Sequence, residues 1–363
     1  MTEPLNKYAS GKELSTAIVA SEPTSTFNAV CNIAGMEPTL FLDFAANDYR
    51  IYSAATGLQR KALTDIITTT GLRSTPGNIY RPIGGFDDIA INVPRIDYDP
   101  ETGICRGLLV EESRQNLFLN SLLDGTSLTT QTVTVTAAAH TVSFFGSGSI
   151  TFSGAYTGTL SGTDDTTWAV ATFTPSAGGL VCTVSGDVKW AQCELGSFAT
   201  SPITTAGTAA TRAADVVKID GTAFAGFNNP LGGTLFASGK VNSDAGFLAN
   251  LFSVSSERVQ IYEPESTLRT AGNSYGNGAI VNPLGSFFAS AIAYEAGYGA
   301  LATNGISAAF VTPPPSVPTL SLLRIGDYEN TGVNQSNGPV GSVIYFPKPL
   351  TQAQLAQLTR LGA

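Results

Sequence analysis

The sequence predicts an all-β protein with two antiparallel β-sandwich (jelly-roll) domains, preceded by an irregular N-terminal attachment region and ended by a short C-terminal helix. Three observations predict this fold class. Apolar and small polar residues alternate with period two in many short segments, as strands with one buried face require. Turn residues separate these segments at intervals of about 8–12 residues, a spacing typical of sandwiches. Charged residues make up only 13% of the chain, so threonine, serine, asparagine and glycine must cover its surface.

Length and charge limit the possible functions. The 363 residues are enough for about two or three domains. The formal net charge of −9 argues against a nucleic-acid partner, which needs clustered lysine and arginine. No stretch of about 20 apolar residues occurs, so we expect no membrane insertion. Residues 1–8 lack the basic start and apolar core of a secretory signal, and we expect assembly in the cytoplasm.

The N-terminal third is expected to be irregular. Residues 1–37 form an arm that proline and glycine interrupt, with room for a short helix or strand at 15–20. Residues 38–125 form an attachment or linking region. Within it we expect a strand at 39–44, a short helix at 58–68 and a further strand in the segment 106–121.

Residues 126–205 carry the clearest strand pattern in the chain. The segment 132–137, TVTVTA, alternates residue by residue. Turns at Gly146, Gly154 and Pro175 separate the strands, and no helix of normal length fits between them. The expected strands of this module span 132–137, 141–145, 150–153, 157–162, 168–173, 180–184 and 188–195.

A connector at 206–231 leads to a second sandwich at 232–363. Thr351 and Gln354 have the spacing of a capping box, and leucines follow at helical spacing, so we expect a short helix at the end of this sandwich. The expected strands before it span 234–239, 251–254, 258–262, 287–294, 305–310, 320–325 and 341–346.

Cysteine and histidine usage gives no sign of a structural zinc site. The four cysteines, Cys31, Cys105, Cys182 and Cys193, form no C-x-x-C pair, and His140 is the only histidine. We expect four free, mostly buried thiols, with a Cys182–Cys193 disulfide as the alternative.

We expect no cofactor and no bound metal. The only candidates for a calcium site are Asp164 with Asp165, and Asp327 near Asn330. Both groups are better explained as turns whose carboxylates face solvent.

The carboxylates do not predict a catalytic pair. Glu111 and Glu112 are adjacent, so on a strand they face opposite sides. Asp97 and Asp99 share a face but lie beside Pro100, where hydrogen bonds within a turn are the better explanation. No G-x-S-x-G motif occurs, and a single histidine leaves little for a hydrolytic triad. We therefore expect a protein that binds without turnover, and not an enzyme.

The best candidate for a ligand site is an aromatic face in the first sandwich. On a regular strand Trp190, Gln192 and Glu194 share one face, and the opposite face resembles core. We therefore expect Trp190 to be exposed beside two hydrogen-bonding groups, the combination that holds sugars. The alternative is that Trp190 packs against a neighbouring domain or subunit. The expected core positions are Ala191, Cys193 and Leu195, and the candidate glycan-binding residues are Trp190, Gln192, Glu194, Trp168 and Tyr156.

Three segments resemble known families. Residues 92–121, NVPRIDYDPETGICRGLLVEESRQNLFLNS, resemble a segment that recurs in bacteriophage tail-fibre and related virion proteins, although Gln115 stands where those proteins often carry threonine. Residues 132–215 are similar to the jelly-roll module that often follows it, notably at AQCELGSFATSP (191–202) and TRAAD (211–215), and such modules resemble carbohydrate-binding modules. Residues 232–363 resemble a concanavalin A-like (laminin G-like) sandwich, notably at VIYFPKPLTQAQL (343–355).

The resemblance implies a non-catalytic structural protein of a bacteriophage virion, such as a tail-fibre, tail-spike or baseplate component that binds the host surface. Its partners would be other virion proteins and a host cell-surface glycan, and fibre architecture implies a homotrimer. Such a protein would be assembled in the host cytoplasm and reside in the virion. The alternatives are a capsid decoration or head-fibre protein that cements the particle and, with less support, a polysaccharide-degrading enzyme.

Overall fold

The chain divides into two compact units, Met1–Glu37 and Pro38–Ala363. The computed structural model describes residues 26–82, 85–122, 126–254, 256–328 and 334–362. The described part of the first unit contains helix α2 (Thr26–Ala34). The helix or strand expected at 15–20 lies outside the described residues. All strands that the structure describes belong to the second unit.

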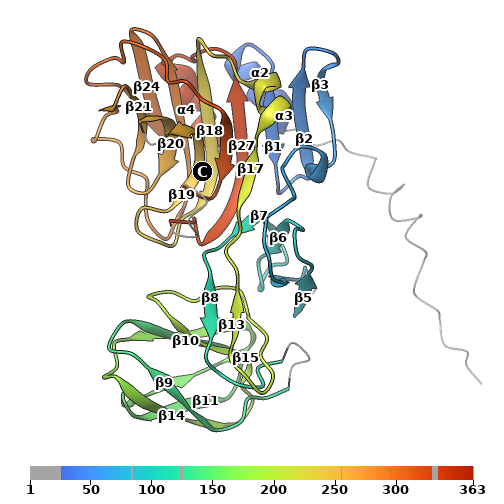
Figure 1. Ribbon diagram of the computed structural model, residues 1–363, viewed down its shortest axis with the longest axis vertical. Coiled ribbons are helices and arrows are strands. Elements are labelled where there is room, and N and C mark those ends of the chain that lie inside the picture. Colours follow the sequence, from blue (N-terminus) through green and yellow to red (C-terminus); the bar gives the residue numbers. More distant parts are fainter. Residues whose placement is uncertain (1–25, 83–84, 123–125, 255, 329–333, 363) are drawn as a thin grey trace, which may run out of the picture. The chain divides into compact units, whose positions relative to one another are not determined.

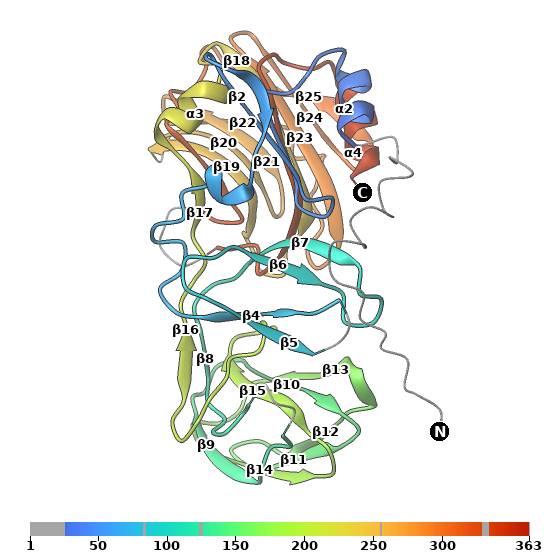
Figure 2. The same ribbon diagram turned by 90° about the vertical axis from the view of Figure 1, so that its right-hand side faces the viewer.

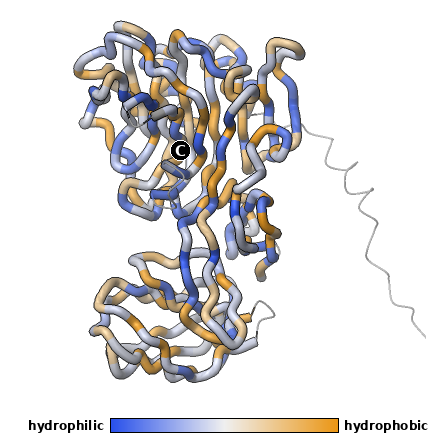
Figure 3. Tube along the Cα trace, viewed as in Figure 1, coloured by the Kyte–Doolittle hydropathy of each residue, from blue (hydrophilic) through white to orange (hydrophobic). Residues whose placement is uncertain are grey.

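The prediction of an all-β fold is confirmed for the second unit. Its described residues form antiparallel sheets, and their helical content is limited to a 3-10 turn at Leu63–Asp65 and to the helices α3 (Gly221–Phe227) and α4 (Gln352–Leu361) (Figure 1). Hydrophobic and hydrophilic stretches are interspersed along the described trace (Figure 3).

The expected C-terminal helix is confirmed, together with its capping box. The Thr351 hydroxyl accepts a hydrogen bond from Gln354 N (3.4 Å), and Gln354 Oε1 accepts one from Thr351 N (3.0 Å). These two bonds satisfy backbone donors that a helix start would otherwise leave unpaired. Leu355 and Leu358 are buried on the inner side of α4.

The larger sandwich consists of two antiparallel sheets (Figure 2). In spatial order the first sheet contains β25 (Ile306–Ala309), β24 (Tyr298–Thr303), β23 (Phe287–Glu295), β18 (Gly232–Lys240), β27 (Gly338–Phe346), β1 (Leu40–Asp43), β2 (Asp48–Ser53) and β3 (Gly57–Arg60). In the same sheet β7 (Cys105–Val110) pairs with β27 and with β6 (Arg95–Tyr98). The second sheet contains β17 (Val217–Ile219), β26 (Leu322–Ile325), β19 (Phe247–Val254), β20 (Glu257–Tyr262), β21 (Ser266–Thr270) and β22 (Asn273–Tyr275).

The segment 38–125, expected to be a linking region, contributes strands to this larger sandwich. β1 lies between β2 and β27, and Leu40 is the register partner of Tyr345. Leu42 belongs to the same buried core as Leu235. The alternation of a strand shows which face is buried but not which strands are its neighbours, so the sequence does not reveal this arrangement.

The helix expected at 58–68 is wrong. Leu58 pairs with Tyr52 across the hairpin of β2 and β3, and only Leu63–Asp65 form a single 3-10 turn. Leu63 and Ile66 enter the core of the larger sandwich from that turn.

The expected connector at 206–231 also carries regular structure. β16 (Ala210–Arg212) pairs with β8 (Arg114–Asn116), and Arg212 stands opposite Arg114. Further along, β17 joins the second sheet of the larger sandwich, and α3 adds Phe224 to its core. The stretches that lead into and out of residues 126–205 therefore run side by side.

The smaller sandwich has a strand at every position expected between 126 and 205. One sheet contains β13 (Asp164–Phe173), β10 (His140–Gly146) and β15 (Lys189–Leu195). The other contains β12 (Gly158–Ser161), β11 (Ser149–Gly154), β14 (Gly178–Ser185) and β9 (Gln131–Val135). Phe144, Phe152 and Cys182 lie in the core that these sheets enclose.

All four cysteines are free thiols, as expected, so the alternative of a Cys182–Cys193 disulfide is wrong. Cys182 and Cys193 are buried, whereas Cys31 and Cys105 are half-buried.

Candidate functional site

A network of buried ionic side chains joins the segments 92–121 and 211–215. Arg95 on β6 pairs with Asp215 and with Glu111 (N···O 2.7 Å), which directly follows β7. Arg73 pairs with Asp215 (2.8 Å), and Arg212 of β16 pairs with Glu111 (2.9 Å). All five side chains are buried. Residues from 92–121 and from 211–215 therefore meet in one network.

Both carboxylate oxygens of Glu111 have donors within this network. Oε1 accepts a hydrogen bond from Ser201 N (2.7 Å), and Oε2 accepts one from Ser201 Oγ (2.6 Å) in addition to its two arginine partners. Burial alone would raise the pKa of Glu111, but Arg212, Arg95 and Ser201 together lower it from 4.5 to about 2. Glu111 is therefore a buried anion with a structural role.

The expectation that Gln192 and Glu194 share an exposed face with Trp190 is wrong. Both side chains are 0% exposed, whereas Leu195, expected in the core, is 53% exposed. Gln192 Oε1 accepts a hydrogen bond from Ile203 N (3.2 Å), and Glu194 accepts two from Thr200, at N (3.0 Å) and Oγ1 (2.5 Å). The segment 200–203 thus covers this face of β15, and both polar groups hold that segment in place.

Trp190 packs against a neighbouring part of the chain, which was the alternative expectation. It has a φ of 49° and lies where the register between β10 and β15 shifts. Its ring contacts Phe145 (centroids 5.8 Å apart) and Phe86 (5.4 Å). Phe86 belongs to the hairpin of β4 (Gly77–Tyr80) and β5 (Phe86–Ile89), outside the smaller sandwich. The irregular backbone turns Trp190 away from the face that a regular strand would give it.

The two remaining candidates, Tyr156 and Trp168, differ in their surroundings. The ring of Tyr156 stacks on Phe173 with centroids 4.1 Å apart and 8° between the planes, so it extends the core of the smaller sandwich. Trp168 packs edge-on against Phe145 (4.9 Å) and is partly exposed. Trp168, one of the predicted glycan-binding residues, lines a cleft.

This cleft, which we call the Trp168 cleft, has a volume of about 440 Å³. Phe287, at the start of β23, is 43% exposed beside it. Arg106 of β7 and Lys240 of β18 supply cations, and Asn242 supplies an amide. The residues that define the cleft here are Trp168, Phe287, Arg106, Lys240, Asn242 and Asp99.

Asp97 and Asp99 also line the Trp168 cleft, in different roles. Asp99 Oδ1 accepts hydrogen bonds from Glu101 N (3.1 Å) and Thr102 N (2.9 Å), which confirms the predicted turn. For Asp97 that prediction is wrong. Its buried carboxylate accepts from Tyr80 N (2.8 Å) and Arg106 Nη2 (2.5 Å), and burial raises its pKa although Arg106 opposes the shift.

Lys240 and Phe287 were not predicted from the sequence as site residues. They are register partners in neighbouring antiparallel strands, so their side chains stand on the same face with Cβ atoms about 5 Å apart. A lysine that ends an otherwise buried strand is a possible signal in the sequence. Its pairing with Phe287, however, depends on a register that the sequence does not show.

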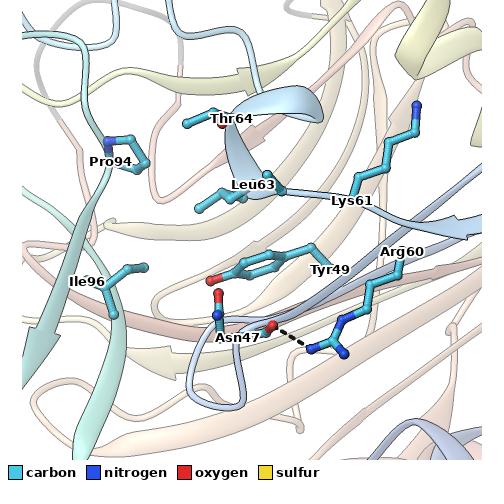
Figure 4. Close-up of a pocket in the computed structure, with 9 residues that line it drawn as sticks. Asn47, Tyr49, Arg60, Lys61, Leu63, Thr64, Pro94 and Ile96 are labelled. Atoms are coloured by element: carbon cyan, nitrogen blue, oxygen red, sulfur yellow. Dashed lines mark hydrogen bonds between the residues drawn. The ribbon is translucent and has the colours of Figure 1, made fainter. Parts of the chain in front are cut away.

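A second hollow, of about 680 Å³, lies beside the hairpin of β2 and β3 (Figure 4). Arg60 Nη2 donates to Asn47 O (3.0 Å), and its Nε lies 3.3 Å from Asp48 Oδ1. The Tyr49 ring is only 5% exposed, and burial raises the pKa of Tyr49 to about 12. This hollow lacks the combination of exposed aromatic rings and cations, so the Trp168 cleft is the better candidate site.

The positions considered for calcium have other partners. Asp164 accepts hydrogen bonds from Thr166 N (2.8 Å) and Thr167 N (2.7 Å), and Asp327 pairs with Arg324 (3.0 Å). Asn330 lies outside the described residues. Within the described ranges, no group of three or more histidine, cysteine, aspartate and glutamate residues is placed to hold a metal ion. The helices in these ranges include none with the length and apolar character needed to cross a bilayer.

No protein-family model and no curated protein sequence matches this chain significantly. Among solved structures, it is similar to a heptameric SAP-like pentraxin from Limulus polyphemus, with 12% identity and a TM-score of 0.26 over 35% of this chain and 68% of that chain. It is also similar to domain 4 of AbnA, an extracellular arabinanase of Geobacillus stearothermophilus in complex with arabinotriose, with 11% identity and a TM-score of 0.33 over 40% and 73% of the two chains.

A leech intramolecular trans-sialidase matches with 18% identity and a TM-score of 0.31, over 37% of this chain and 24% of that chain. At these identities and TM-scores, what the three proteins bind or cleave is a property of those proteins.

Proposed function

We propose that this protein is a non-catalytic structural component of a bacteriophage particle, such as a tail-fibre, tail-spike or baseplate protein, that binds a host-surface glycan in the Trp168 cleft. The observation that carries the binding activity is the composition of the cleft, whose lining includes the partly exposed side chains of Trp168 and Phe287 together with Lys240 and Asn242. Sugar rings stack on aromatic side chains and exchange hydrogen bonds with such polar groups. The cleft volume, about 440 Å³, lies within the range of about 300–1,000 Å³ that is usual for small-molecule sites.

The virion role is supported by the resemblance of residues 92–121 to tail-fibre and related proteins. Arg95 and Glu111 of this segment form the centre of the buried network, so the resemblance extends to residues with a physical role in this fold. We further propose that the protein is a homotrimer that contacts other virion proteins. A stable monomer in a mass measurement at micromolar concentration would contradict the homotrimer.

A polysaccharide-degrading enzyme is the second candidate, because Asp97, Asp99 and Glu111 line the same cleft. Glycoside hydrolysis needs one carboxylic acid that donates a proton and a second carboxylate that is free to act as base or nucleophile. The carboxylates of Asp97 and Glu111 are buried, and both oxygens of each carboxylate accept at least one hydrogen bond. The carboxylate of Asp99 accepts a hydrogen bond from Thr102 N within its own turn. These bonds favour binding over catalysis.

Binding is tested by titrating host-surface polysaccharide into the purified protein and measuring affinity by calorimetry. We expect Trp168→Ala and Phe287→Ala each to weaken binding by about tenfold or more, the scale of a central aromatic contact. Tyr52→Ala is the matched control, because this aromatic side chain is 38% exposed on β2, away from the cleft. Lack of binding, or equal affinity in all variants, would reject glycan recognition in this cleft.

Two further measurements separate the alternatives. Release of reducing ends from the polysaccharide during incubation with the protein would establish hydrolysis and reject the non-catalytic proposal. Subunit-resolution imaging of intact particles would show whether the protein lies on the tail, the baseplate or the capsid. A position on the tail or baseplate is expected, and a position between capsid subunits would favour the decoration or head-fibre alternative.

A further inference from the structure

The Trp168 cleft contains a cation without a counter-ion. Lys240 is half-buried at the end of β18, and in the described part of the chain its ammonium group has no carboxylate within ion-pair distance. Lys189 and Lys218, by contrast, pair with aspartates at 2.7 Å and 2.8 Å. Burial, and then the neighbouring Arg106, lower the pKa of Lys240, as expected for a positive charge that lacks compensation.

Arg106, which pairs with Asp97, is a second cation in the lining of the cleft. Its Nη2 donates to Asp97 at 2.5 Å. Its Nε is buried and has no hydrogen-bond partner among the residues that the structure describes. The Arg106 side chain nevertheless lines the cleft and is 38% exposed, and its charge lies close enough to Lys240 to lower the pKa of that lysine.

The other charges of the cleft do not neutralise Lys240. Glu111 is paired with Arg95 and Arg212, and Asp97 is paired with Arg106. Asp99 is half-buried and bound to the backbone of its own turn, and no ion pair links it to Lys240. Because burial of an uncompensated charge is unfavourable, an anion that enters the cleft gains a partner at Lys240.

The aromatic surface beside Lys240 is positioned by the strand register. Phe287 on β23 is the direct partner of Lys240 on β18. Gly341 is the extra residue where the register between β18 and β27 shifts, and a Cβ atom there would lie 3.0 Å from Phe287 Cζ. The absence of a side chain at Gly341 thus leaves room for the Phe287 ring, which reaches across β18 to β27.

We propose that the Trp168 cleft selects an acidic glycan, in which a sugar ring lies on Phe287 and a carboxylate or phosphate group is bound by Lys240 and Arg106. This inference rests on the proposed glycan-binding function and adds the chemical class of the ligand. The two anionic groups share one recognition chemistry, charge-assisted hydrogen bonds from an ammonium and a guanidinium.

The test uses the full chain and pairs of probes, each consisting of an acidic glycan and its neutral derivative. Oligogalacturonate is compared with its methyl ester, polysialic acid with its methyl ester, and phosphomannan with its dephosphorylated form. We expect at least one acidic probe to bind about tenfold or more tightly than its neutral form, the scale of a hydrogen bond to a charged group. Preference in the ester pairs identifies a carboxylate ligand, and preference in the phosphomannan pair identifies a phosphate.

Variants of the lysine complete the design. Lys240→Met is expected to remove the preference for the acidic probe, and Lys240→Arg to retain it. Lys348→Met, at an exposed site outside the cleft, changes the net charge equally and is expected to bind like the wild type. Higher ionic strength should weaken the wild type more than Lys240→Met.

If the probes bind, two outcomes would overturn the acidic-glycan inference without affecting the proposed function. One is tight binding of a neutral probe that depends on Trp168 but shows no preference for charge. The other is a preference for the acidic probe that survives in Lys240→Met. If the wild type binds none of these probes but still binds host-surface polysaccharide, only the acidic-glycan inference fails. If it binds neither the probes nor the polysaccharide, the proposed function is rejected as well.

Discussion

Arg73 and Asp215, which are 142 positions apart in the sequence, form an ion pair of 2.8 Å whose side chains are 0% and 1% exposed. Asp215 Oδ2 also accepts a hydrogen bond from Glu111 N (3.0 Å), and Asp215 pairs with Arg95. Buried charges are tolerated where their donors and acceptors are complete. This network therefore fixes the two stretches of chain that lead into and out of the smaller sandwich.

Replacing Arg95 is expected to destabilise the protein strongly. Arg95→Met leaves Glu111 and Asp215 buried with fewer partners, so the free energy of unfolding should fall by about 3–5 kcal/mol. Urea denaturation followed by tryptophan fluorescence measures this change. The matched control is Lys218→Met, whose ion pair with Asp220 (2.8 Å) has side chains that are 30% and 36% exposed. This partly exposed pair should contribute about 0–1 kcal/mol, and equal losses in the two variants would show that the network is not a major source of stability.

Glu194 is expected to make the protein less stable as the pH rises. Burial raises the pKa of Glu194 from 4.5 to about 7, although hydrogen bonds from Thr200 oppose the shift. The folded state therefore holds a proton that the unfolded state releases, and stability is lost between pH 4.5 and about 7. Relative to Glu194→Gln, the wild type should lose up to about 3 kcal/mol over this range. Urea denaturation across a pH series measures the free energy of unfolding of both proteins. If this free energy changes with pH equally in the two proteins, the pKa of Glu194 is not raised.

Glu111 is expected to act in the opposite direction. Its pKa is lowered from 4.5 to about 2, so its contribution is complete above pH 4.5 and is lost as the pH falls through about 2. The stability advantage of the wild type over Glu111→Gln should therefore shrink on acidification below pH 4.5. Unfolding curves for both proteins in the acidic range test this. A constant difference between them would mean that Glu111 is not held as an anion by Arg212 and Arg95.

Tyr156→Ala should separate stability from binding. Its ring stacks on Phe173, so truncation should cost about 3 kcal/mol through the cavity that it leaves in the smaller sandwich. Because Tyr156 does not line the Trp168 cleft, the folded variant should bind glycan with the affinity of the wild type. Thermal unfolding and calorimetric titration of the same preparation measure both properties. A stable variant with weakened binding would return Tyr156 to the list of glycan-binding residues.

The strands of the smaller sandwich were predictable because apolar and small polar residues alternate along most of them, including β10, which is buried on both faces. β24 was not predicted, since residues 299–303 are all buried and include glycine and alanine. A strand that is buried on both faces lacks the alternation of apolar and polar residues that indicates one solvent-exposed face. The positions of β1, β2 and β3 in the larger sandwich also could not be read from the sequence, because the order of strands depends on pairing between distant segments.

The candidate site was predicted only in part, for a related reason. Gln192 and Glu194 have the spacing of an exposed polar face, but the segment around Thr200 covers them and supplies their hydrogen bonds. Polar residues at alternate positions show that a face needs hydrogen bonds, and not that water provides them. Lys240 and Phe287 lie 47 positions apart (287 − 240) and become neighbours only through the register of β18 and β23.

The pairing of β1 with β27 sets an order of events during synthesis of the chain. The strands of the smaller sandwich pair only with one another, within residues 131–195, so this part can fold as soon as it has emerged from the ribosome. β1 is translated before all of them, but its partner β27 comes after them. At about 5–20 residues per second, the apolar Leu40–Leu42 segment waits on the order of tens of seconds for that partner. The larger sandwich therefore cannot close until every strand of the smaller sandwich has been synthesised.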